Sequence, residues 1–173
     1  MTKPTRRSVP RAVVIALAGI VAVLAVVALV LGVAKLVRGD AGVRGLSKAE
    51  LAAVTAAKQQ TINIQTYRLK SFDNDVSVAV AGMTPDQAAQ LQAGEKDLKD
   101  RLTRLKQDLG ATVSGAGLVS FDGKSAVVLV SSDSQRIDTA TGKATTFAQN
   151  RYQMTLRLTG GKWLMEKLQT VSL

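Results

Sequence analysis

The sequence predicts an α+β domain behind an N-terminal membrane anchor. Three observations lead to this fold class: an uninterrupted apolar run over residues 12–34, helical periodicity over residues 47–109, and a period of two with turn signals from residue 111 onward. Helical segments followed by strands joined through short hairpins favour helices packed on one face of an antiparallel meander. We therefore expect about three helices packed on a four-stranded antiparallel sheet.

Composition narrows the possible functions. The chain has 173 residues, no cysteine and no histidine. This excludes disulfides, a thiol nucleophile, a Ser-His-Asp triad and metal sites built from Cys or His. Aromatic residues make up only 3% of the chain, a thin supply for stacking on nucleic-acid bases. The formal charge of +10 nevertheless suggests binding to nucleic acid, so the distribution of the basic residues along the chain has to be considered.

The apolar run is long enough to cross a membrane. It spans 23 residues without a charged or strongly polar side chain, and about 20 suffice for the hydrocarbon core. The apolar part of a cleaved signal peptide, at roughly 7–15 residues, is shorter. We predict an uncleaved signal anchor at residues 12–37, with a cleaved signal peptide and a buried core helix as the alternatives. Residues 1–11 then form a basic tail, residues 38–45 a glycine-rich linker, and residues 46–173 one domain.

Basic residues on both sides of the apolar run bear on its orientation. They are Lys3, Arg6, Arg7, Arg11, Lys35 and Arg38. The short, purely basic tail favours a cytoplasmic N-terminus and an extracytoplasmic C-terminal domain. These six residues account for +6 of the net charge, leaving +4 elsewhere. That remainder lacks the basic cluster of a DNA-binding surface, so we expect no nucleic-acid partner.

Three helices are expected after the linker. The first begins at Ser47, which forms a capping box with Glu50, and is predicted to run to about Ser71. The second is capped by Asp73 and ends at Gly82. The third begins at Thr84-Pro85-Asp86, follows a leucine stripe to Leu109, and is stopped by Gly110.

Four strands are expected in the second half. They cover residues 111–121, 125–132, 147–159 and 162–171. The pairs Asp122-Gly123 and Gly160-Gly161 are typical of tight hairpin turns, and residues 138–143 form a longer polar turn. A twisted sheet of this kind, curled round a long helix, forms a cone.

No group of residues has the spacing of a catalytic, metal or cofactor site. Asp73 and Asp75 are not followed by residues at calcium-loop positions, and Gly115 and Gly117 precede no helix. The residues singled out for the cone interior or its rim are Tyr67, Tyr152, Met154 and Trp163. Core packing is the ordinary explanation for each, so we expect no enzyme and no cofactor.

Several strings, in this order, resemble the Mce-associated membrane proteins of actinobacteria. They are the basic tail and span, Asn63, Thr66, Tyr67 and Asp73 near the end of the first helix, residues 110–113 (GATV), 116–122 (AGLVSFD), 126–130 (AVVLV), 151–156 (RYQMTL) and 161–164 (GKWL). The resemblance implies a cystatin-like cone related to the ketosteroid-isomerase group. It also implies a non-enzymatic, membrane-anchored accessory subunit of an Mce-type lipid transport system of the cell envelope, acting through contacts with transporter subunits.

Two alternatives share this architecture. Similar anchored cones serve as assembly subunits of type IV secretion and conjugation machines. A cone can also bind a lipid or another small apolar ligand in its own cavity.

Overall fold

The computed structural model describes residues 45–171, so the predicted tail, anchor and most of the linker lie outside the described residues. The elements are α2 (Lys48–Asn63), a 3₁₀ turn η2 (Leu69–Ser71), α3 (Phe72–Ala81), α4 (Pro85–Ala93), α5 (Glu95–Leu105), β1 (Gln107–Phe121), β2 (Ser125–Asp138), β3 (Ala144–Thr159) and β4 (Lys162–Thr170). Over this range no helix combines the length and apolar character needed to span a membrane. The α+β fold class is confirmed.

Helix α2 begins as predicted and ends earlier. The Ser47 hydroxyl accepts a hydrogen bond from the Glu50 amide, and the Glu50 carboxylate accepts one from the Ser47 amide at 2.8 Å. The predicted continuation to Ser71 is wrong. The backbone of Tyr67 instead pairs with Leu109, exchanging two N–H···O bonds of 3.0 and 2.8 Å. A residue in such a bridge cannot continue a helix, and α2 ends at Asn63.

Helix α3 ends before Gly82, as predicted, but Asp73 does not cap it. Ser71 occupies the N-cap position, and Asp73 lies in the first turn of the helix. There its carboxylate pairs with the ammonium group of Lys99 on α5, at 2.6 Å. The acidic residue therefore ties two helices together instead of starting one.

The predicted third helix is two helices. It begins at Thr84-Pro85 as expected, although the Thr84 hydroxyl makes no capping hydrogen bond, and it breaks at Gly94 into α4 and α5. Helix α5 ends at Leu105 because Lys106 takes a left-handed conformation with φ of 51°. Leu109 and Gly110 consequently belong to β1. The described residues thus hold four α-helices where about three were predicted.

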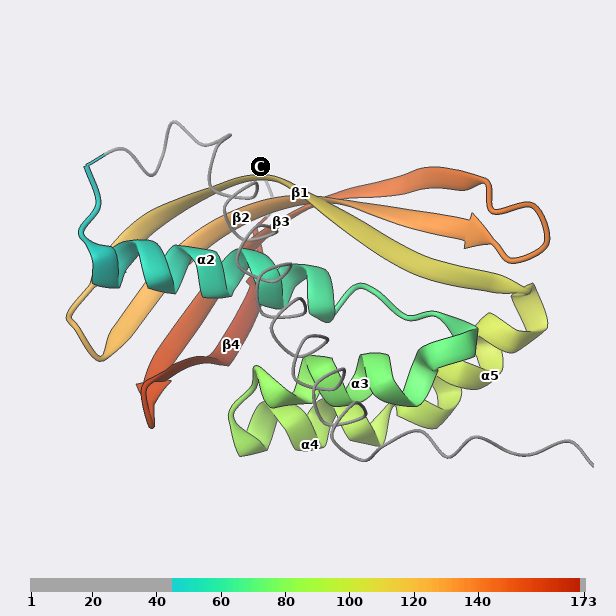
Figure 1. Cartoon of the computed structure of the whole chain (residues 1–173), viewed down its shortest axis with the longest axis horizontal. Helices are drawn as coiled ribbons and strands as arrows, with labels where there is room; N and C mark the ends of the chain where they lie inside the picture. Colours follow the sequence, from blue (N-terminus) through green and yellow to red (C-terminus); the bar gives the residue numbers. More distant parts are fainter. Residues whose placement is uncertain (1–44, 172–173) are drawn as a thin grey trace, which may run out of the picture. The chain divides into compact units, whose positions relative to one another are not determined.

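The sheet has the predicted antiparallel order β1-β2-β3-β4. Both tight turns fall where expected, with positive φ at Gly123 (88°), Gly160 (56°) and Gly161 (78°). Positive φ is accessible to glycine at no steric cost. Strands β1, β2 and β3 are longer than predicted. Because β4 pairs only with residues 152–159 of β3, the β2–β3 hairpin extends past it (Figure 1).

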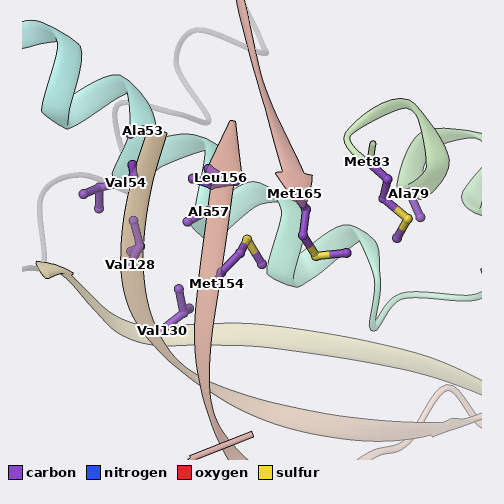
Figure 2. Close-up of a cluster of buried hydrophobic side chains, with 11 residues drawn as sticks. Ala53, Val54, Ala57, Ala79, Met83, Val128, Val130, Met154, Leu156 and Met165 are labelled. Atoms are coloured by element: carbon purple, nitrogen blue, oxygen red, sulfur yellow. The ribbon is translucent and has the colours of Figure 1, made fainter. Parts of the chain in front are cut away.

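The main core lies between α2 and the sheet. Ala53, Val54 and Ala57 face Val128 and the neighbouring strand residues, and all are buried (Figure 2). Alanine at two of these positions permits close approach of the helix to the sheet. Burying one Val or Leu side chain contributes about 1.5–3 kcal/mol. Further side chains of this core are Ala79, Met83, Ala126, Val130, Met154, Leu156 and Met165.

Candidate functional site

A pocket of about 390 Å³ opens between the segment that follows α2 and the part of the sheet formed by the start of β1, the end of β2 and the first half of β3. This volume falls within the usual range for small-molecule sites. Its lining comes from four regions: the segment after α2, the two helices α4 and α5, the start of β1, and the facing halves of β2 and β3. The lining residues are Ile64, Gln65, Tyr67, Leu91, Leu98, Leu109, Gly110, Ser134, Gln135, Phe147, Ala148, Asn150 and Tyr152.

One end of the pocket is polar and internally hydrogen-bonded. The Gln65 amide nitrogen donates to the Ser132 hydroxyl at 3.1 Å, and the Ser134 hydroxyl donates to the Gln65 amide oxygen at 2.6 Å. The Asn150 amide donates in turn to the Ser134 hydroxyl at 2.7 Å. This network fixes the turn after α2 to strands β2 and β3.

The remaining walls are apolar. Ile64, Leu91 and Leu98 contribute from the helical side, while Leu109 and Phe147 contribute from the sheet. Phe147 is 44% exposed, and the guanidinium carbon of Arg136 lies 4.3 Å from its ring centroid. None of the lining residues carries a formal charge.

Tyr67 is the most deeply buried polar residue of the lining. It is 3% exposed, and its hydroxyl has no hydrogen-bond partner in the part of the chain that the structure describes. Burial, together with the nearby negative charge of Asp75, raises the pKa of Tyr67 to about 12. Burial also raises the pKa of Tyr152. Both hydroxyls therefore stay protonated near neutral pH, where neither serves as a general base.

An ion pair between the half-exposed Arg68 and the buried Asp75 holds the segment that carries Tyr67. The Asp75 carboxylate accepts a hydrogen bond of 2.8 Å from the Arg68 backbone amide and two of 2.6 and 3.1 Å from the Arg68 guanidinium. Burial alone would raise the pKa of Asp75, but the hydrogen bonds and charge of Arg68 outweigh it and lower this pKa. Arg68 is half exposed, whereas Asp75 is buried.

The four residues singled out from the sequence fall in three places. Tyr67 and Tyr152 line the pocket, and Met154 is buried under α2. Trp163 packs on Phe121, with ring centroids 5.8 Å apart. The six basic residues assigned to membrane topology lie outside residues 45–171.

Sequence reasoning missed the polar end of the pocket. Gln65 was placed inside a helix, and Ser134 and Asn150 stand 69 and 85 residues further along the chain. The one local signal was Asn150, a polar residue in step with the inward side chains Tyr152 and Met154 of the same strand.

The sheet face turned away from the helices forms a second candidate site. Val119 and Leu129 are 56% and 43% exposed on it, and Gly117 lies opposite Leu129 in the register. Beside them is a shallow polar hollow lined by Ser114, Ser131, Ser132, Asp133, Gln149, Asn150 and Arg151. Ser132 and Asn150 also take part in the hydrogen-bond network of the pocket, so we call only Val119, Leu129, Ser131, Asp133, Gln149 and Arg151 the outer face.

Within residues 45–171 no group of three or more acidic side chains is placed to hold a metal ion.

A family model described as "Uncharacterized protein Rv1363c/MT1408-like" matches residues 12–172. The chain belongs to this family. No curated protein sequence matches the chain significantly.

Solved structures with the same fold are distant in sequence. An IcmL-like type IV secretion system protein from Legionella pneumophila is 12% identical with a TM-score of 0.59, the match covering 75% of this chain and 95% of that one. The periplasmic domain of DotI is 13% identical with a TM-score of 0.59, covering 76% and 100%. A TrwG component of a type IV secretion system from Bartonella birtlesii is 14% identical with a TM-score of 0.51, covering 73% and 94%.

Proposed function

We propose that this family member is a membrane-anchored scaffold subunit of a multiprotein membrane machine, with its α+β domain outside the cytoplasm. The observation that carries the proposal is the fold shared with the IcmL-like secretion protein and the DotI periplasmic domain over nearly their whole lengths. The apolar run at residues 12–34 supports it, since it supplies the predicted anchor.

The chemistry of the pocket supports a role without catalysis. Its lining holds no carboxylate, lysine or arginine, and both of its tyrosines have raised pKa values. General acid–base catalysis near neutral pH needs a group that exchanges a proton there. We therefore propose that the domain acts by binding.

We assign the protein contacts of the scaffold to the outer face. Val119 and Leu129 are apolar side chains left in solvent beside hydrogen-bonding groups, a composition typical of protein interfaces. Among residues 45–171 the helices pack on the opposite side of the sheet, and Val119 and Leu129 stay exposed for contact with a partner.

Two kinds of machine fit this role, and the fold favours the first. A type IV secretion-like or conjugation-like channel is favoured by the structural neighbours. An Mce-type lipid transport system is favoured by the sequence strings that resemble Mce-associated proteins. The family description names neither partner.

The test is chemical crosslinking in native membranes, followed by purification of the tagged full-length chain and identification of its partners by mass spectrometry. Channel subunits support the first machine, and lipid-transport permease or Mce subunits support the second. Recovery of the chain with no partner subunit contradicts the scaffold role.

A matched pair of variants locates the contact. Leu129→Arg places a charge on the outer face, and we expect it to abolish the crosslinks. Leu105→Arg makes the same change at a leucine that is 55% exposed at the end of α5, and should leave them intact. Equal crosslinking of both variants would move the contact away from the outer face.

A further inference from the structure

We propose that the pocket at the end of α2 binds an uncharged amphiphile, meaning an apolar chain or ring body with one hydroxyl, ester or amide group. This inference goes beyond the scaffold role and does not depend on it.

The absence of charged side chains from the lining indicates the class of ligand. Charged residues make up 21% of the chain, yet none lines the pocket. An ionised group placed among these side chains would lose its hydration without meeting an opposite charge on a lining residue, because Arg136, which stacks on Phe147, does not itself line the pocket. A neutral molecule avoids this desolvation free energy, so the site favours it over an ionised fatty acid or phosphate ester.

The apolar walls fit the body of such a ligand. Ile64, Leu91 and Leu98 face it from the helices, with Leu109 and Phe147 on the sheet side. Ligand sites of this size are usually lined by apolar side chains with a few polar groups that fix orientation. Phe147 is half exposed, so an apolar body seated against it removes aromatic surface from water.

The polar end fits the single polar group of the ligand. Amide and hydroxyl side chains both donate and accept hydrogen bonds, and Gln65, Ser134 and Asn150 already form a connected set. Such a set recognises a hydroxyl, ester or amide without requiring charge.

The test uses the full-length chain in phospholipid nanodiscs with a monoacylglycerol that carries a photoreactive diazirine in its acyl chain. After illumination, mass spectrometry locates the labelled peptides. We expect labels on peptides that contain Leu91, Leu98 and residues 147–152. A diazirine fatty acid of the same chain length, ionised at pH 8, should label them at least about tenfold less, because its carboxylate is desolvated without a partner.

Variants tie the label to the pocket. Ala148→Phe fills the cavity from β3 and should remove the label. Asn150→Leu removes a member of the polar end and should weaken labelling several-fold, whereas Gln149→Leu makes a similar change one residue away on the outer face. Circular dichroism checks that each variant is folded, so Asn150→Leu keeps the test valid if Ala148→Phe does not fold.

Three results would overturn the inference. Equal labelling by the fatty acid contradicts the neutral ligand class. Labelling that persists in both Ala148→Phe and Asn150→Leu contradicts the site. Absence of label from the pocket peptides contradicts ligand binding there, while the crosslinking test of the scaffold role stands unaffected.

Discussion

Tyr67 contributes to the domain through both its backbone and its side chain. Its backbone forms the bridge to Leu109 that ends the α2 segment, and its buried hydroxyl makes no hydrogen bond within residues 45–171. A buried polar group without a partner costs free energy, since it gives up its bonds to water on folding. The residue therefore costs stability in the position that lines the pocket.

Tyr67→Phe should stabilise the domain. It removes the unpaired hydroxyl and keeps the ring that packs on Phe72 at 5.7 Å, so we expect the free energy of unfolding to rise by about 1 kcal/mol. Urea denaturation followed by circular dichroism measures the change. Tyr152→Phe, in the same pocket, is the control and should raise it by less. A loss of stability in Tyr67→Phe would show that the hydroxyl has a partner.

The Asp75 carboxylate should make the free energy of unfolding depend on pH in the acidic range. Its pKa is lowered in the folded state, so its contribution is fully present above its ordinary pKa of about 4 and is lost as pH falls through the lowered value. At pH 7, Asp75→Asn should cost about 1–2 kcal/mol, a range discounted because Arg68 is half exposed. The difference from wild type should shrink below pH 4.

A neighbour on the same helix provides the control. Asp73→Asn removes an exposed pair with Lys99, and surface pairs of this kind contribute less than about 1 kcal/mol. Denaturant midpoints measured at pH 7 and pH 3 compare the two variants. A gap between wild type and Asp75→Asn that is the same at both pH values would contradict the role of the carboxylate charge.

Helices α2 and α3 are locked together at Gly82. The buried Gln60 side chain donates a hydrogen bond to the Ala79 carbonyl at 2.8 Å, and its amide oxygen would lie 2.0 Å from a Cβ on Gly82. The φ of Gly82, −98°, is one that any residue adopts. Glycine is therefore required here for space, so that Gln60 reaches the end of α3.

Gly82→Ala should cost about 1–3 kcal/mol of unfolding free energy, because Gln60 must leave its buried position. Gly94→Ala is the matched control at another helix end, where the nearest atom to the added Cβ is 3.8 Å away, and it should be close to neutral. A double variant with Gln60→Ala should recover part of the loss. Additive effects of Gly82→Ala and Gln60→Ala would contradict the contact.

The elements differ in how far the sequence predicts them. The Ser47 capping box and the two hairpin turns depend on residues close together in the chain, and the structure confirms all three. The length of α2 depends on the pairing of Tyr67 with Leu109, 42 positions apart (109 − 67). Leu109 itself continued a leucine stripe, and only the left-handed turn at Lys106 moves it into a strand.

The candidate pocket was predictable only in part. Tyr67 and Tyr152 stood out as the chain's only tyrosines, and both line it. Its polar end forms where one turn meets two strands, so no local pattern contains it. Gln65 has the sequence context of a helix residue. In the structure α2 ends at Asn63, so Gln65 lies outside the helix and bonds to Ser132 on β2.

At the scale of the whole molecule, residues 39–173 form one compact unit. We expect a chain of residues 39–173 to remain in the supernatant after ultracentrifugation and to unfold cooperatively. The full-length chain should sediment with membranes and resist extraction by alkaline carbonate. A full-length chain that alkaline carbonate releases would contradict the predicted anchor.

The short reach of β4 leaves residues 144–150 of β3 at the edge of the sheet. Residues 144–150 of β3 pair with β2 alone, apart from Phe147 at a register shift, whereas residues 152–157 pair with both β2 and β4. Amide hydrogens of the first group should therefore exchange with deuterium faster than those of the second, with lower opening free energies. Phe147, Ala148 and Asn150 belong to the group expected to exchange fast, so we expect this wall of the pocket to open to solvent without global unfolding of the core.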